Sequence, residues 1–200
     1  MSRVAAIFLA LAMLLGGFAV GHAFADPEPP VGRPTVADIG FAQDMAVHHE
    51  QAVQMSRLVQ GVDGDVSVVA AQIMEAQTRE SGMMRGWLDV WGAPQLPRGA
   101  PMAWMDHGVV DAGAMPGMAS SADLDRLARA TGEAQQRLFL QLMIRHHRGG
   151  IEMADAAVEL AALPAVRSAA RLMAAEQAKE IAAMTPMLAR LDAPDLDGAG

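Results

Sequence analysis

The sequence predicts an all-α fold: a ferritin-like four-helix bundle built from two repeated helical hairpins with a long central crossover. Three observations predict it. Apolar residues recur at helical spacing in four long segments, no segment alternates with the period of two that marks a strand, and the second half of the chain repeats the first. A single hairpin cannot bury its own apolar stripe, so the two hairpins are expected to pack together.

The repeat extends over both helices of each hairpin. Seven positions of the first helix match at an offset of 98 residues: Phe41, Gln43, Met45, His48, His49, Val53 and Met55 correspond to Phe139, Gln141, Met143, His146, His147, Ile151 and Met153. Four positions of the second helix match at an offset of 100: Gln77, Glu80, Met84 and Leu88 correspond to Gln177, Glu180, Met184 and Leu188. The change in offset places a two-residue length difference in the turn of the hairpin.

Capping, glycine and proline signals mark the helix ends. Thr35, followed three residues later by Asp38, resembles a capping box and begins the first helix, which Gly61 helps to end. Pro164 suits the first position of the last helix, and Pro186 is expected to bend it. The helices after the first are expected over about residues 65–91, 121–130, 133–161 and 164–191.

These signals divide the chain into four parts. Residues 1–25 are interpreted as a signal peptide, 26–34 as a flexible proline-rich tail, 35–192 as the helical bundle and 193–200 as a C-terminal tail. Within the bundle, repeat one covers 35–92, a methionine-rich crossover covers 93–120, and repeat two covers 121–192.

The leader predicts export. Arg3 precedes an apolar run from Val4 to Val20, and His22-Ala23-Phe24-Ala25 ends in the A-x-A pattern of a cleavage site. The alternative is an uncleaved leader that tethers the protein to a membrane, because seventeen apolar residues lie near the lower limit for a span. Either interpretation places the bundle outside the cytoplasm, in the periplasm, outside the cell or at the cell envelope.

Composition narrows the possible partners. The formal net charge is −8 and the acidic residues are dispersed, which argues against nucleic-acid binding. The chain has no cysteine, so its core must hold it together without disulfides. Of its sixteen methionines, all but Met1 and Met13 lie beyond the leader and supply soft sulfur in a compartment where thiols are liable to oxidation.

Two histidine doublets stand between methionines, in MAVHHEQAVQMS (45–56) and MIRHHRGGIEMA (143–154). Helical spacing puts these histidines on the apolar stripe, so they are expected in the core. An unpaired buried polar group costs roughly 1–3 kcal/mol, and Glu80 and Glu180 are the expected partners. Gly149 and Gly150 weaken a helix, so they are expected to admit another backbone or a long side chain.

Imidazole and thioether together favour low-valent copper, with silver as its mimic. Calcium and magnesium prefer oxygen ligands, and zinc would leave the methionines unused. The predicted ligands are His48, His49, His146 and His147, then Met45, Met55, Met143 and Met153, with Glu80, Glu180, Gln77 and Gln177 orienting them. The protein would buffer or deliver copper, and the metal ion is the partner that these residues indicate.

Two other functions stay open. The histidines and glutamates could form a polar layer that only fixes the packing of a structural or interaction module. A ferritin-like metal oxidase is the enzymatic alternative, but its Glu-x-x-His spacing is missing, since methionines stand three residues before His48 and His146. No residue is assigned a catalytic role, because the chain has no cysteine, no G-x-S-x-G motif and no phosphate-binding glycine loop.

The crossover offers further soft ligands. Its possible loop site consists of Met102, Met105, His107, Met115 and Met118. These residues could hold a soft ion without help from the bundle, or the methionines could simply cover apolar surface. Met74, Met83 and Met173 are interpreted as packing residues.

The segment LFLQLMIRHHRGGIEMA, with MPGM before it and EQAKEIAAM after it, resembles domain-of-unknown-function family 305 over about Ile39 to Leu191. That resemblance implies a secreted bacterial protein with a ferritin-like bundle and one or two His-His motifs, here at His48-His49 and His146-His147. Some relatives are linked to copper or silver binding outside the cytoplasm. The chain departs from the family pattern at Arg148, beside the second doublet, and at Ser81, where an aliphatic residue is usual.

Overall fold

We describe a computed structural model of the chain, which covers residues 32–62, 64–105, 108–109, 111–192 and 196. The predicted leader, most of the predicted proline-rich tail, His107 and nearly all of the C-terminal tail lie outside the described residues. In the described part the regular structure is helical, with no strand. None of the described helices combines the length and apolar character that a membrane crossing requires.

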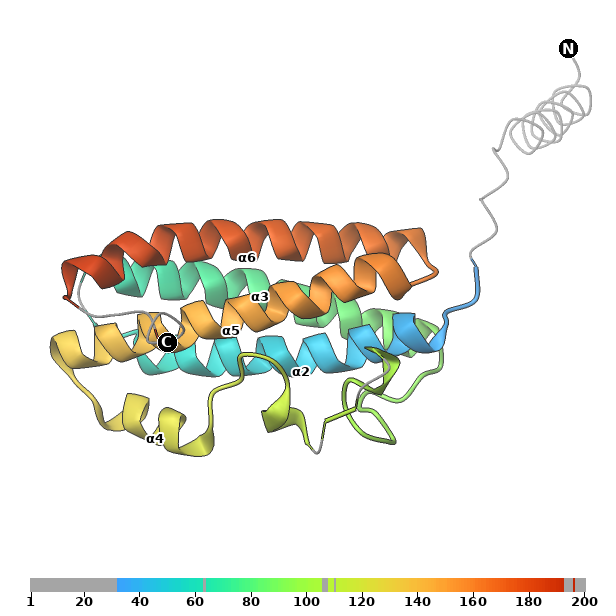
Figure 1. Ribbon diagram of the computed structural model, residues 1–200, viewed down its shortest axis with the longest axis horizontal. Coiled ribbons are helices and arrows are strands. Elements are labelled where there is room, and N and C mark those ends of the chain that lie inside the picture. Colours follow the sequence, from blue (N-terminus) through green and yellow to red (C-terminus); the bar gives the residue numbers. More distant parts are fainter. Residues whose placement is uncertain (1–31, 63, 106–107, 110, 193–195, 197–200) are drawn as a thin grey trace, which may run out of the picture. The chain divides into compact units, whose positions relative to one another are not determined.

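Four long helices form the predicted bundle (Figure 1). They are α2 (Val36–Leu58), α3 (Asp65–Val90), α5 (Gly132–Leu160) and α6 (Pro164–Arg190). Helix α2 packs along α3 and α5 packs along α6, so each repeat is a hairpin. The hairpins meet mainly through α2 and α5, whereas α3 and α6 contact each other more sparsely.

The helix ends lie close to the predicted ones. Thr35 and Asp38 form the capping box at the start of α2, and Pro164 occupies the first turn of α6. Asp38 also accepts hydrogen bonds from the backbone N–H groups of Leu163 (2.9 Å) and Ala162 (3.3 Å), which joins α2 to the α5–α6 turn. Burial alone would raise the pKa of Asp38, but these hydrogen bonds, with those from Thr35, lower it.

The crossover packs on α2 and α5 through η1 (Ala103–Met105), η2 (Ala112–Ala114) and α4 (Ser121–Arg129) (Figure 1). Buried Asp44 on α2 fixes its first part, accepting hydrogen bonds from the Met102 N–H (2.8 Å) and the Trp104 indole (2.9 Å). Gln51 fixes its last part: its amide nitrogen donates to the Ala119 carbonyl (2.9 Å) and its oxygen accepts from the Ala119 N–H (2.7 Å).

Gly149 and Gly150 admit the close neighbours that the sequence predicts. A Cβ on Gly149 would lie 2.0 Å from the Pro116 carbonyl oxygen of the crossover. A Cβ on Gly150 would lie 2.2 Å from Oε1 of Gln177 on α6. A Cβ on Gly117, whose φ is +76°, would lie 2.5 Å from the Arg145 carbonyl oxygen and 2.9 Å from the backbone of His146. The crossover therefore approaches α5 at the second histidine doublet.

Two buried apolar clusters lie on either side of the histidines along the bundle. The first, called the methionine-rich cluster, contains Met45, Met84, Met102, Met115, Met153 and Met173 with Phe41, Leu88 and other small and apolar residues. The second cluster contains Met55, Met143 and Met184 with Phe139, Ile73, Leu142 and other apolar residues. The histidine doublets fall between these clusters in both α2 and α5.

We expect Gly149→Ala to lower the free energy of unfolding by about 1–3 kcal/mol, because the new methyl group collides with the Pro116 carbonyl. The matched control is Gly86→Ala in α3, where an added Cβ meets nothing within 4 Å. That change should raise the free energy of unfolding by about 0.4–1 kcal/mol. Urea denaturation of both variants measures the difference, and equal stabilisation by both would contradict the close approach.

Candidate metal centre

The four doublet histidines lie fully buried in the centre of the bundle, as the sequence predicts. His48 of α2 and His146 of α5 occupy equivalent positions in the two repeats, and their rings face each other across the hairpin interface. The ring centroids are 3.8 Å apart and the planes are inclined by 32°. The His146 and His147 centroids are 6.2 Å apart. One group of imidazoles thus forms where the two hairpins meet.

The predicted histidine–glutamate pairs form in both repeats. Nε2 of His49 lies 2.7 Å from Oε2 of Glu80, and Nε2 of His147 lies 2.6 Å from Oε2 of Glu180. An ionised carboxylate can only accept, so each imidazole donates its Nε2–H to the glutamate. Nδ1 of each ring is buried without a hydrogen-bond partner. This is the arrangement in which a carboxylate fixes the tautomer of a metal-binding histidine.

The facing histidines differ from each other. Nε2 of His48 lies 3.0 Å from the Pro116 carbonyl oxygen, which accepts its hydrogen and leaves Nδ1 as a lone pair. Neither ring nitrogen of His146 makes a well-formed hydrogen bond, although the His48 backbone lies close enough to oppose the lowering of its pKa. The crossover therefore breaks the symmetry of the repeats at this pair. Sequence reasoning missed the Pro116 carbonyl, because a backbone oxygen leaves no trace in residue identity.

Unpartnered polar atoms concentrate in this layer. Among the described residues, twelve buried side-chain nitrogen and oxygen atoms lack a hydrogen-bond partner. Nine of them belong to the four histidines and to Gln77 and Gln177, whose amides are unpartnered at both atoms. Folded proteins rarely leave such groups unsatisfied, and exceptions call for an explanation such as a binding role. The structure brings the imidazoles together with Glu80 and Glu180, and Gln177 packs against Gly150 beside the second doublet.

Electrostatics keeps the facing imidazoles neutral. Burial, followed by the nearby charge of His49, lowers the pKa of His48 to about 3. Burial, followed by the charges of His48, His147 and His49, holds the pKa of His146 well below its usual 6.5. The charged forms of these rings are disfavoured by desolvation and by one another. Both rings can therefore offer nitrogen lone pairs to a cation at neutral pH.

The predicted methionine ligands lie in the clusters beside the histidines. Met45 and Met153 belong to the methionine-rich cluster, and Met55 and Met143 belong to the second cluster. Within the described residues, no three His, Asp or Glu side chains are arranged to hold a metal together. The clusters on both sides of the layer contain thioether sulfur, which is a soft donor.

The crossover methionines lie on the bundle rather than apart from it. Met102 and Met115 are buried in the methionine-rich cluster, and Met105 and Met118 pack partly buried against it. The remaining residue of the predicted loop site, His107, lies outside the described residues, so this second site stays a prediction. Arg148, the departure beside the doublet, is exposed, and Ser81 is buried with its hydroxyl unpartnered.

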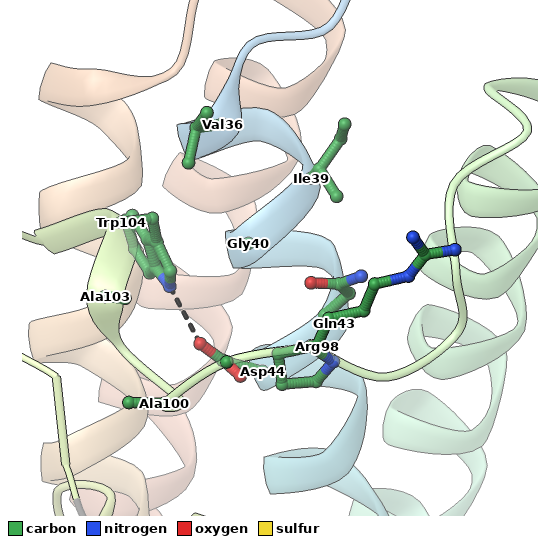
Figure 2. Close-up of a pocket in the computed structure, with 11 residues that line it drawn as sticks. Val36, Ile39, Gly40, Gln43, Asp44, Arg98, Ala100, Ala103 and Trp104 are labelled. Atoms are coloured by element: carbon green, nitrogen blue, oxygen red, sulfur yellow. Dashed lines mark hydrogen bonds between the residues drawn. The ribbon is translucent and has the colours of Figure 1, made fainter.

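A pocket of about 230 Å³ lies elsewhere, between the start of α2 and the crossover (Figure 2). Val36, Ile39 and Trp104 line it with Asp44, and Figure 2 shows the indole of Trp104 donating to Asp44. Burial raises the pKa of Asp44, and the hydrogen bonds to Met102 and Trp104 oppose that shift. The pocket shares no residue with the histidine layer, and its carboxylate serves to anchor the crossover.

The fold and the site define a duplicated helical hairpin with a buried centre of histidines. The chain belongs to the family described as domain of unknown function DUF305, whose model matches residues 38–188. This confirms the resemblance seen in the sequence. Among curated proteins, none matches the chain significantly.

Solved structures agree with the family assignment. A presumed secreted DUF305 protein from Streptomyces coelicolor is 41% identical, with a TM-score of 0.74 over 80% of this chain and 96% of that one. A DUF305 fragment from Deinococcus radiodurans is 29% identical, with a TM-score of 0.68 over 80% and 99%. CopM in its Cu(II)-bound form is 24% identical, with a TM-score of 0.61 over 76% and 96%, and supports the fold. CopM is also known in Cu(I)-bound and silver-bound forms.

We expect stability to fall as the pH drops from about 6.5 toward 3. In that range an unfolded histidine binds a proton, whereas buried His48 and His146 do not, so protonation favours the unfolded chain. Replacing His146 by leucine should make the dependence shallower by up to about 1.4 kcal/mol per pH unit.

Urea denaturation of the metal-free protein at several pH values between 7 and 4 measures this slope. Comparing wild type with His146→Leu cancels the acid sensitivity of Asp38, which both chains share. Equal slopes would contradict a neutral His146 in the folded protein.

Proposed function

We propose that this protein binds copper(I), or silver(I) in its place, at the buried histidine layer, and that it buffers or delivers copper outside the cytoplasm. The ligands are drawn from His48, His49, His146 and His147, with sulfur from Met45, Met55, Met143 and Met153. Glu80 and Glu180 orient His49 and His147 by accepting their Nε2–H hydrogens.

One observation carries the proposal: five imidazole nitrogens are buried without a partner in a single layer between two methionine-containing clusters. Leaving such atoms unpaired costs roughly 1–3 kcal/mol each, and a metal ion would recover that cost. Nitrogen lone pairs beside thioethers suit low-valent copper better than hard cations. The copper-bound and silver-bound forms of the distant relative CopM are consistent with this chemistry.

Export of the protein is part of the proposal. The leader predicts export, and the similar protein from Streptomyces coelicolor is described as a presumed secreted protein. A soft site made without cysteine fits an oxidising compartment, because a thioether is not consumed by disulfide formation.

A titration of copper(I) against a competing chelator tests the proposal. The wild-type protein should bind copper(I) more tightly than micromolar. Replacing all four histidines by leucine should weaken binding by more than the roughly 10- to 100-fold expected when a residue that only orients a ligand is lost. Micromolar or weaker binding that is unchanged in the four-histidine variant would refute the histidine site.

Three further variants show which residues outside the histidine doublets contribute to copper(I) binding. Glu80→Gln should weaken binding by about 10- to 100-fold, because the amide holds His49 without the negative charge. Glu75→Gln on the exposed side of the same helix should leave binding unchanged. His107→Leu tests the predicted loop site, since copper(I) held by the crossover alone would depend on that residue.

A structural role for the layer makes the opposite prediction for the metal-free protein. If the layer exists to stabilise packing, His146→Leu should lower the free energy of unfolding. Under the copper proposal the same change should leave it equal or raise it by about 1 kcal/mol or more, because both ring nitrogens of His146 lack partners. Urea denaturation at pH 7.5 with a chelator present distinguishes the two functions.

A further inference from the structure

Two grooves lie between α3 and α6, and the repeat relates them. The first has a volume of about 360 Å³ and the second of about 190 Å³. Arg79, Glu80, Met83, Ala169, Leu172, Met173 and Glu176 line the first. Val69, Gln72, Ile73, Lys179, Glu180 and Ala183 line the second, and each corresponds to a residue of the first at an offset of 100.

Each groove touches the histidine layer through one carboxylate. Glu80 has 18% of its side chain exposed and contacts buried His49, and Glu180 has 20% exposed and contacts buried His147. On the α2–α5 side, by contrast, Pro116 and Gly117 pack directly on the layer. On the α3–α6 side, these partly exposed carboxylates therefore connect the layer to solvent.

The two grooves differ in their soft ligands. Met83, which is 38% exposed, and buried Met173 line the first groove, where the second has Ala183 and Ile73. The first groove also adjoins the methionine-rich cluster, to which Met173 belongs and which holds six buried methionines against three in the second cluster. Thioether sulfur is thus present both at the exposed opening of the first groove, on Met83, and in the buried cluster behind it, on Met173.

Charges at the first groove leave Glu80 available. Arg79 pairs with Glu75 at 3.9 Å, and Glu176 accepts from Lys179 at 2.7 Å. These pairs are exposed, and such pairs are weak and screened by salt. The second oxygen of Glu80, two thioethers and Glu176 can therefore face a bound cation.

We propose that the Met83–Met173 groove is an outer site for a soft monovalent cation, copper(I) or silver(I), and the point at which that ion enters the histidine layer past Glu80. This inference rests on the proposed function of the histidine layer. The equivalent groove around Glu180 lacks both sulfurs and does not capture the ion.

Silver(I) titration of protein labelled with ¹³C at the methionine methyl groups tests the site in the intact fold. The Met83 and Met173 methyl signals, assigned from Met83→Ala and Met173→Ile, should shift at the first substoichiometric additions. Met187, which packs against the second cluster, serves as the internal control and should not shift with them. Unmoved Met83 and Met173 signals while the histidines bind silver would overturn the inference alone.

An exchange of residues between the grooves tests the route. The double variant Met83→Ala/Met173→Ile gives the first groove the alanine and isoleucine that the second groove has at the equivalent positions. It should slow silver(I) loading of the histidines severalfold, while the final occupancy of the histidines is unchanged. The reverse variant, Ala183→Met/Ile73→Met, should restore fast loading in that background. Unchanged loading rates would overturn the route, whereas a lack of any histidine response in wild type would refute the proposed function itself.

Discussion

The rest of this structure depends on one constraint: four imidazoles share the buried centre of the bundle, and they cannot all carry charge. Desolvation and mutual repulsion keep His48 and His146 neutral. The fold supplies three hydrogen-bond acceptors to the four rings, from Glu80, Glu180 and Pro116. The remaining ring nitrogens are buried without partners, and the lone pairs of neutral His48 and His146 are among them. The unpartnered nitrogens make the layer costly, and the lone pairs make it suited to a cation.

The two repeats differ in the hydrogen-bond partners of their facing histidines, and the crossover causes this difference. Gln51 holds Ala119 through two hydrogen bonds, whereas its counterpart Gly149 makes room for Pro116. The first repeat thus binds the crossover through a side chain, whereas the second repeat lacks a side chain at the equivalent position and the crossover backbone packs directly on its helix. The backbone so placed reaches His48 and leaves His146 without a partner. Asymmetry at the centre of the bundle therefore originates in residues that flank the histidine doublets.

Much of this arrangement follows from local sequence pattern. Helical periodicity and the 98- to 100-residue repeat predict the bundle, and the shared stripe predicts buried histidines with Glu80 and Glu180 as partners. The pairing of His48 with His146, the role of Pro116 and the grooves between α3 and α6 depend on how the hairpins and the crossover dock. Such long-range contacts leave only indirect signals in one sequence. The differences between repeats at Gln51 and Gly149 are one such signal.

Sequence differences between the repeats also make the two sides of the histidine layer unequal in methionine content. Duplication alone would place equal methionines on both sides of the histidine layer, as Met45, Met55 and their counterparts still are. The crossover adds Met102 and Met115 to one side, and Met173 replaces the isoleucine found at its counterpart, so soft ligands concentrate there. A soft ion would be attracted to that side first, because the opposite side offers it mostly aliphatic and aromatic carbon. Under the proposed entry route, this imbalance distinguishes the two sides of the histidine layer in an otherwise repeated bundle.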